Sequence, residues 1–315
     1  MYTRNIPASS LWAWLCAAVT GPVAMMAAGC SWPISLGLGL GAGAVYLGTL
    51  SGGERKLPRP VLLLELVWTG VILVWVLGES ARIWPDSNAH PTVPLVLLAL
   101  SVWASSDSTR GPRIGSVCLY LLALLFGVVI LCAQGDVRPG WTLPQAGGTW
   151  EPLVLSLLLP AGAFLLPREG AGKKPWALLP GVLAAAVSLC AGGVLAPWVA
   201  WELPDPLWEL GRSIRLMGSS VHLEAVLCAG LVLSWFCLSS YLVTMGASVF
   251  QKLLPERSSW GRWVGGGTCA GALLCEVSVA VSFLLLGTTI FWVFIPILTQ
   301  AVDKIKKMQN FKKSA

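Results

Sequence analysis

LEAVLCAGLVLSWFCLSSYLVTMGASVF, residues Leu223–Phe250, decides the fold class of this chain. Glu224 is its only charged residue. At about 1.5 Å of rise per residue, the stretch is long enough to cross the roughly 30 Å hydrocarbon core of a membrane. The preceding segment Asp205–His222 is polar and contains Arg212. The sequence therefore predicts a membrane-spanning helix whose most informative chemistry lies at its ionisable entrance.

Composition extends this prediction to the whole chain. Of 315 residues, 56% are hydrophobic and 11% are charged, which is typical of a polytopic membrane protein. The net charge of +6 does not indicate nucleic-acid binding, because the basic residues lie in short loops between apolar runs. The nine cysteines include no C-x-x-C pair, and the two histidines are far apart, so we expect no metal, cofactor or disulfide. No nucleophile elbow is present, so we expect no enzyme.

The apolar runs predict ten membrane spans. The run after Arg262 is too long for one span, and we place a turn at Glu276. The other runs are Leu11–Cys30, Pro33–Leu50, Val61–Gly78, Pro91–Ala104, Ile114–Ala133, Pro152–Leu166, Trp176–Val199 and Leu223–Phe250. We expect a single membrane domain over residues 1–315, with halves at 1–133 and 152–302 and a basic tail at 303–315.

The basic residues orient these spans. A ten-span arrangement places 17 of the 21 lysines and arginines on one face, including the tail. Because cytoplasmic loops carry the excess of lysine and arginine, the sequence predicts that both termini are cytoplasmic.

Two spans contain residues that interrupt helices. Gly21 and Pro22 lie near the middle of the first span, and Pro160, Ala161 and Gly162 lie within the short sixth. Spans one and six correspond if the bundle is built from two five-helix halves. Paired interruptions at corresponding positions indicate a transporter-type binding site, because exposed backbone at mid-membrane can hold a small polar ligand. We therefore predict ligand binding at these five residues.

Other stretches predict packing. Gly37–Gly43 superimposes two GxxxG patterns and predicts close helix contact. Asp205 is placed to cap a short helix beginning at Pro206. Its apolar stripe of Leu207, Leu210, Ile214 and Met217 predicts a helix lying on the outer membrane surface.

The carboxylates near or within spans differ in their neighbours. For Glu65 we expect a local partner among Arg55, Lys56 and Arg59, and for Glu79 the partner Arg82. Glu224 lies near the outer end of its span, where it either orders the outer loop or gates a ligand. A gate or coupling group is expected from Glu224, His222, Glu79 and Arg212.

The order of several motifs resembles the spore germination permease family, the B subunits of nutrient germinant receptors in the amino acid–polyamine–organocation transporter superfamily. Arg212-Ser213-Ile214 is similar to the family's R-x-I turn, and Val221–Ala225 resembles the start of its eighth span, with a Trp-containing helix following at Trp235–Tyr241. His222 stands where the family usually has Arg, and an acidic residue often found before the span-one Trp is replaced by Cys30 and Ser31. Further similarities lie at Ala27–Trp32, Thr109–Arg113, Leu143-Pro144 and Pro296 with the basic tail.

This resemblance implies a bundle of two inverted five-helix repeats in the inner membrane of an endospore. It also implies recognition of a small nutrient such as an amino acid, with A-type and C-type receptor subunits and membrane lipid as partners. A free-standing transporter of amino acids or amines and a degenerate structural subunit that binds no ligand are the alternatives.

Overall fold

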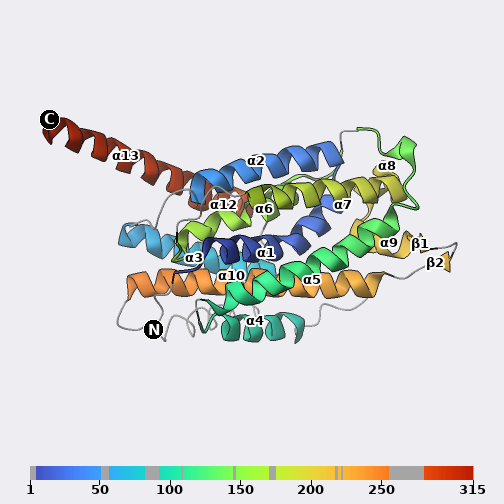
Figure 1. The fold of residues 1–315 in the computed structure, drawn as a ribbon, viewed down its shortest axis with the longest axis horizontal. Coiled ribbons are helices and arrows are strands. Elements are labelled where there is room, and N and C mark those ends of the chain that lie inside the picture. Colours follow the sequence, from blue (N-terminus) through green and yellow to red (C-terminus); the bar gives the residue numbers. More distant parts are fainter. Residues whose placement is uncertain are drawn as a thin grey trace.

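Helices lie side by side in a bundle in the computed structural model of the chain (Figure 1). The structure describes residues 5–50, 57–81, 92–107, 109–144, 147–169, 175–216, 219–220, 223–254 and 280–314. Up to residue 133 the helices are α1 (Ala8–Ala28), α2 (Trp32–Leu50), α3 (Arg59–Ser80), α4 (Thr92–Ala104) and α5 (Arg110–Ala133). The helices that follow are η1 (Pro139–Trp141), α6 (Glu151–Leu158), η2 (Leu159–Leu165), η3 (Pro175–Leu178), α7 (Leu179–Leu195), α8 (Pro197–Glu202) and α9 (Pro206–Ser213). After them come β1 (Arg215–Leu216), β2 (Ser219–Ser220), α10 (Glu224–Leu253), α12 (Val281–Thr288), the π-helical turn η5 (Thr289–Phe294) and α13 (Ile295–Ser314).

The chain is an integral membrane protein. Its described residues contain six helices long and apolar enough to cross a membrane, and three shorter apolar helices. Together these correspond to nine of the ten predicted runs. The remaining run, between Arg262 and Glu276, lies outside the described residues.

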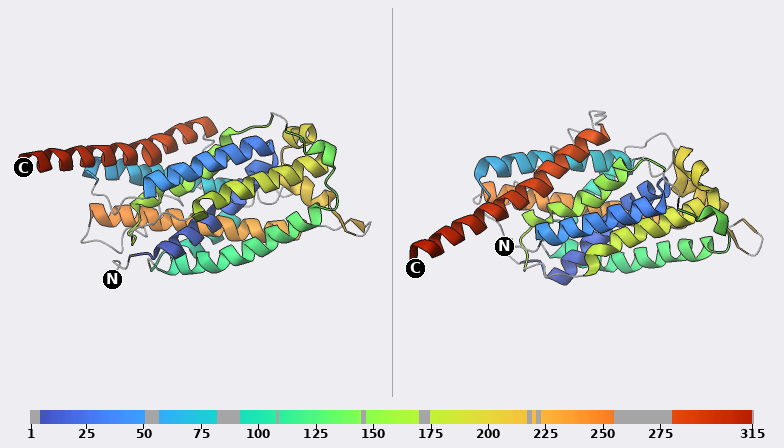
Figure 2. Two further views of the ribbon diagram at one scale, coloured as in Figure 1. Left: turned by 45° about the horizontal axis from the view of Figure 1, so that its top comes forward. Right: turned by 90° about the horizontal axis from the view of Figure 1, so that it is seen from above.

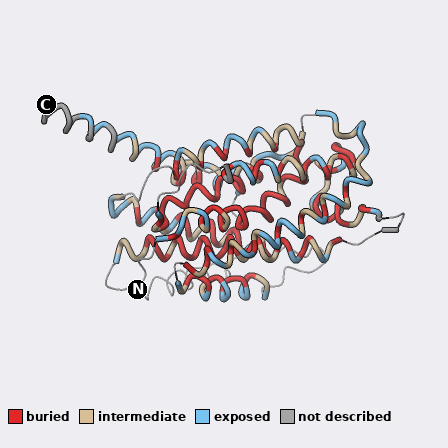
Figure 3. The backbone as a smooth tube through the Cα atoms, in the orientation of Figure 1, coloured by how far each residue is buried: buried red, intermediate tan, exposed pale blue. Residues whose placement is uncertain are grey.

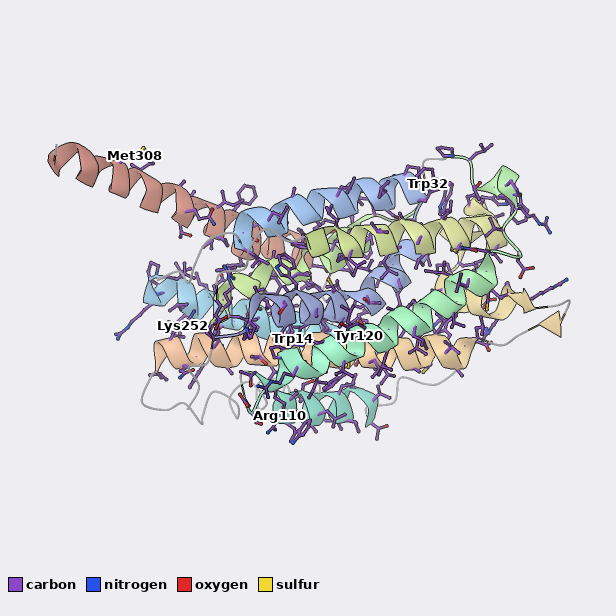
Figure 4. All side chains as sticks on the ribbon, in the orientation of Figure 1. Trp14, Trp32, Arg110, Tyr120, Lys252 and Met308 are labelled. Atoms are coloured by element: carbon purple, nitrogen blue, oxygen red, sulfur yellow. The ribbon has the colours of Figure 1, made fainter. Side chains whose placement is uncertain are left out.

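The centre of the bundle is α1, which packs against α10, α5 and α7. In the apolar 18-residue segment of each helix, 83% of the residues of α1 and 72% of those of α10 are buried inside the protein (Figure 3). The corresponding share for α5 is 28%. The aromatic side chain that fixes this centre is Trp14, at the middle of the bundle (Figure 4). Its ring packs on Gly111 and Gly115 of α5, and its Nε1 donates a hydrogen bond to Ser240 Oγ at 3.3 Å. The small residues of α5 let the two helices approach closely.

Glycines also set the contacts of α2 with α7 and with η3, the short helix just before α7. A Cβ on Gly39 would collide with the backbone of Gly181, and one on Gly43 would lie 3.0 Å from the carbonyl oxygen of Ala177. Gly37 and Gly41 face open space on the other side of α2. Close packing is therefore confirmed for the GxxxG pattern of Gly39 and Gly43, and not for that of Gly37 and Gly41.

The two ends of the bundle differ. One end holds α8, α9 and the β1–β2 hairpin, and we call it the hairpin end (Figures 1 and 2). The opposite end holds the start of α1 and the projecting α13, and we call it the tail end. The hairpin pairs Arg215 with Ser220 and Leu216 with Ser219.

The short helix α9 begins at Pro206 as predicted, but it does not lie on the membrane surface. Leu207, Leu210 and Ile214 of its apolar stripe are buried inside the protein, where α9 packs against α7, α1 and α10. Met217 lies outside the described residues. Asp205 occupies the N-cap position without a side-chain capping bond. The apolar stripe faces the bundle because the ends of α1, α7 and α10 present apolar side chains that α9 covers.

Candidate functional site

The predicted interruption at Gly21 and Pro22 does not break the first helix, because α1 is continuous from Ala8 to Ala28. Pro22 has no N–H to donate to the carbonyl one turn earlier. A hydroxyl group from another helix forms hydrogen bonds with the backbone of α1 at this position. Ser234 Oγ of α10 accepts the N–H of Gly21 at 2.7 Å and donates to the carbonyl of Ala17 at 2.8 Å, with that of Ala18 at 3.2 Å.

This contact explains why position 21 is a glycine. A Cβ on Gly21 would lie 2.8 Å from the Cβ of Ser234, closer than two such atoms approach. The prediction of an open break in the first span is therefore wrong. A hydroxyl from a neighbouring helix satisfies the backbone freed by a proline, as is common in membrane helices.

The predicted interruption in the sixth span is confirmed. The α-helix α6 gives way at Leu159 to the 3₁₀-helix η2, in which Pro160, Ala161 and Gly162 are fully buried. The narrower 3₁₀-helix has weaker hydrogen-bond geometry, so its carbonyl groups are open to other donors. Side chains of the protein fill this role.

Four side-chain donors reach carbonyl oxygens of η2. Tyr241 Oη donates to the carbonyl of Leu159 at 3.2 Å, and Arg168 Nη1 donates to that of Ala163 at 2.8 Å. The carbonyl of Leu165 accepts from Ser248 Oγ at 3.0 Å and from Lys252 Nζ at 3.1 Å, near the tail end of α10 (Figure 4). Three of these donors belong to α10, so side chains of α10 bond to the backbone of both α1 and η2.

The two interruptions lie at different depths along α10. Gly21 contacts Ser234, whereas Gly162 contacts Met245. The 11 residues between Ser234 and Met245 correspond to about 16 Å along a helix. The structure therefore does not bring Gly21 and Pro22 together with Pro160, Ala161 and Gly162 around one point.

The predicted gate is partly assembled at the hairpin end. Arg212 in the last turn of α9 bonds with its Nε to Glu224 Oε1 and with its Nη1 to Glu209 Oε1, both at 3.1 Å. Glu224 is the first residue of α10, where the helix dipole favours a negative charge. These side chains are between a quarter and two fifths exposed. The group links the end of α9 to the start of α10.

The other two predicted gate residues are not part of this group as described. Glu79 lies in the last turn of α3, a separate helix. Its predicted partner Arg82 and the histidine His222 both lie outside the described residues.

Sequence reasoning expected an ion pair for Glu65, which is instead a buried carboxylate in the described part of the chain. Glu65 in α3 is 0% exposed, and neither of its oxygens has a hydrogen-bond partner among the residues that the structure describes. Of its three predicted partners, Arg59 is exposed and forms no ion pair with it, and Arg55 and Lys56 lie outside the described residues. The spacing of Glu65, Trp68, Thr69 and Ile72 signals this burial, because it places all four on one helix face.

Trp292 joins Glu65 to the interrupted sixth span. Its indole Nε1 lies beside the carboxyl group of Glu65, outside hydrogen-bond geometry. The other side of the indole packs on Gly162, where a Cβ would lie 2.9 Å from the ring. Gly162, Trp292 and Glu65 thus form a continuous contact through the bundle, from η2 through η5 to α3.

A pocket opens separately at the hairpin end. It lies where α1 meets α2, beside α7 and α8, and encloses about 300 Å³ including space open to solvent. Trp32, Trp141, Trp201 and Ser31 line it. None of the predicted binding or gate residues does.

The fold is that of membrane transporters. It matches the crystal structure of MhsT in complex with L-phenylalanine, with a TM-score of 0.58 and 13% sequence identity, over 94% of this chain and 89% of MhsT. It also matches Mhp1, a nucleobase-cation-symport-1 family transporter in a closed conformation with bromovinylhydantoin bound. There the TM-score is 0.51 and the identity 13%, over 91% of this chain and 76% of Mhp1.

No protein-family model and no curated protein sequence matches the chain. Both MhsT and Mhp1 share 13% of their residues with the chain, so what the comparison shows is a common fold. Among the described residues, no group of three or more His, Cys, Asp or Glu side chains could hold a metal ion.

Proposed function

We propose that this protein is the permease-like B subunit of a spore germinant receptor, which recognises a small nutrient such as an amino acid and triggers germination. The observation that carries the proposal is the transporter fold over 94% of the chain, shared with a protein whose structure holds an amino acid. The ordered motifs around Arg212, Glu224 and Trp235 direct this fold to the germination permease family. A-type and C-type receptor subunits are the expected partners.

Helix contacts support two inverted five-helix repeats. In such an arrangement each span of the first half corresponds to one of the second, and corresponding spans meet near the symmetry axis. Contacts of this kind join α1 to α6, α2 to α7 and α3 to α10. The contact of α1 with α5 likewise has a counterpart in that of α6 with α12.

The proposed orientation has the tail end in the cytoplasm. The basic residues of the α4–α5 loop, of the α10 end and of α13 all belong to the predicted cytoplasmic face. The start of α1 lies at the tail end, and α13 projects from the same end (Figure 2). The membrane would be the endospore inner membrane, with the hairpin end facing outward.

We place the proposed ligand site at the interrupted backbone of Pro160, Ala161 and Gly162, because Gly21 and Pro22 lie in the continuous helix α1 at a different depth along α10. In the conformation described here, donors from α10 already occupy carbonyl oxygens of η2 and the freed backbone of α1. A carbonyl oxygen has two lone pairs, so a ligand ammonium group can share it with such a donor. Binding would therefore couple directly to the position of α10.

The ion group of Glu209, Arg212 and Glu224 would transmit this movement, because it joins α9 to the first residue of α10. The test is nutrient-triggered germination of spores that carry Glu224→Ala. We expect loss of germination, with normal amounts of the variant and of its partner subunits in the membrane. Glu151→Ala is a matched control, because Glu151 also begins a helix but lies outside the ion group. Normal germination of the Glu224→Ala spores would remove the gate role.

A free-standing secondary transporter of amino acids or amines is the second candidate. The buried carboxylate of Glu65 favours it, because carboxylates inside membrane bundles commonly mark ion pathways. Uptake of an amino acid by proteoliposomes containing this chain alone, driven by an ion gradient, would support this candidate over the receptor.

A degenerate subunit that binds no ligand is favoured by the donors already bonded to the carbonyl groups of η2. In that case no nutrient would change the thermal stability of a receptor complex that still assembles. A nutrient-dependent rise in stability that Gly162→Val removes would contradict this candidate.

A further inference from the structure

Four polar side chains that have no hydrogen-bond partner in the described part of the chain gather on the helices around the contact between α3 and the last membrane helix. They are Glu65 and Trp68 of α3, Thr288 of α12 and Trp292 of η5, and all four are buried. Thr288 lies one turn before Trp292 on the same helix face. We call this group the α3–α12 cluster. An uncompensated polar group in a membrane interior is costly, so a cluster of them needs a physical account.

Aromatic packing holds this cluster in place. The ring of Trp68 stacks on Phe291 at a centroid distance of 5.4 Å and meets Phe283 edge-on at 5.8 Å. Gly287 leaves the space for the Trp68 ring, since any Cβ there would collide with it. The π-helical turn that carries Phe291 and Trp292 is a rare conformation that occurs frequently at functional sites. Trp68 is therefore held among aromatic rings one turn from Glu65, which is itself fully buried.

Within the described part of the chain, no cation compensates Glu65. The helices α4 and α12 and the turn η5 carry no titratable side chain. From α10 come Lys252 and Tyr241, which donate to the carbonyl groups of Leu165 and Leu159. Arg168, at the end of the sixth span, bonds to the carbonyl groups of Ala163 and Leu50.

We propose that Glu65 is a proton-binding site in the interior of the bundle, neutral while α3 and α12 are packed together and charged when they separate. A carboxylic acid costs far less than a carboxylate in such a setting. Releasing the proton breaks the O–H bond and leaves both electrons on the carboxylate, and the proton passes to water at the tail end. Glu65 is six residues from the start of α3, or about 9 Å along the helix.

The lining favours a proton over a metal cation. Sodium and similar ions need several oxygen ligands, whereas the indole of Trp292 lies beside Glu65, and that of Trp68, one turn along α3, packs on Phe283 and Phe291. Because Trp292 packs on Gly162, a change in the protonation of Glu65 that moves the indole would also move the interrupted sixth span. This inference concerns proton binding alone and holds for a receptor or a transporter.

The test is infrared spectroscopy of the full-length protein in lipid nanodiscs, without any nutrient. Ordinary aspartate and glutamate side chains are ionised at pH 7. We expect the wild type at pH 7 to show the C=O band of a protonated carboxyl group, and this band to disappear on raising the pH. Glu65→Gln should lack the band at pH 7 and above, because the amide keeps the shape of the side chain but has no carboxyl group. Glu79→Gln, a substitution at the other end of α3, should retain it.

A second readout is thermal unfolding. The wild type should lose stability as the pH rises through the range in which the band disappears, whereas Glu65→Gln should not respond over that range. Identical spectra of the wild type and Glu65→Gln would overturn the proposal. So would stabilisation of the wild type by sodium without a protonated carboxyl band, which would assign Glu65 to a metal cation. Neither result would bear on the proposed receptor function, since no nutrient or partner is involved.

Discussion

Glu224 and Glu65 are the same residue type in opposite settings. Glu224 lies at the mouth of α10, more than a quarter exposed, and bonds to Arg212. Glu65 lies inside the bundle, 0% exposed and without a hydrogen-bond partner. Sequence neighbours identify the first, because its basic partner lies just upstream in the chain. Only the folded bundle identifies the second, because burial removes it from the cations near it in sequence.

The comparison also separates two physical roles. An exposed ion pair contributes little to stability, so the Glu224 group is suited to signalling by small movements of α9. A buried carboxyl group contributes a large energy difference between its two protonation states, so Glu65 is suited to driving a helix rearrangement. Matched substitutions at both positions test this difference.

The largest effect is expected from placing a lysine at each position. Glu65→Lys places a cation inside the bundle without a partner, at a cost of about 3 kcal/mol on the membrane insertion scale. Glu224→Lys loses an exposed ion pair and faces Arg212, which costs less than about 1 kcal/mol. Thermal denaturation of both variants in the same detergent measures the difference. Equal losses of stability would show that Glu65 already has access to water.

Replacement by leucine is expected to give opposite signs at the two positions. Glu65→Leu removes a buried polar group without a partner and should stabilise the protein, by about 1–3 kcal/mol if the leucine packs as well. Glu224→Leu removes an ion pair and should destabilise it slightly. Chemical denaturation of the two variants beside the wild type provides the measurement. Destabilisation by Glu65→Leu would mean that the carboxyl group forms a hydrogen bond or ion pair that stabilises the folded protein.

Most of the architecture could be predicted from sequence, because membrane spans depend on local hydrophobicity. Leu223–Phe250 predicted α10, and Pro160–Gly162 predicted the change of helix type in the sixth span. The site could not be predicted equally well, because its bonds join residues far apart in the chain. Ser234 is 213 residues from Gly21, and no local pattern indicates that its hydroxyl would keep α1 continuous. Trp292 and Glu65 are similarly remote.

The ion pair of the hairpin end should show a small coupling energy. A double-mutant cycle with Arg212→Ala and Glu224→Ala should give about 0.2–1 kcal/mol, because both side chains remain partly exposed to solvent. Added salt should reduce this energy by screening. A coupling energy well above this range and insensitive to salt would indicate that the pair is buried in the membrane, which would remove the contrast with Glu65.

The smallest effect is expected at a third carboxylate, in the exposed loop between α4 and α5. The backbone N–H of Thr109 donates to Asp107 Oδ1 at 3.0 Å, and this hydrogen bond lowers the pKa of Asp107 below its ordinary value. A lowered pKa means that the folded state favours the carboxylate. Its contribution to stability is therefore present above the ordinary pKa of aspartate and is lost as the pH falls through the lowered one.

Asp107→Asn should remove this part of the acid sensitivity, measured by thermal unfolding between neutral and acidic pH. Because stability should fall with acid at Asp107 and with alkali at Glu65, the two carboxylates should act in opposite directions on one pH profile. An Asp107→Asn variant as acid-sensitive as the wild type would show that the loop bond contributes nothing measurable.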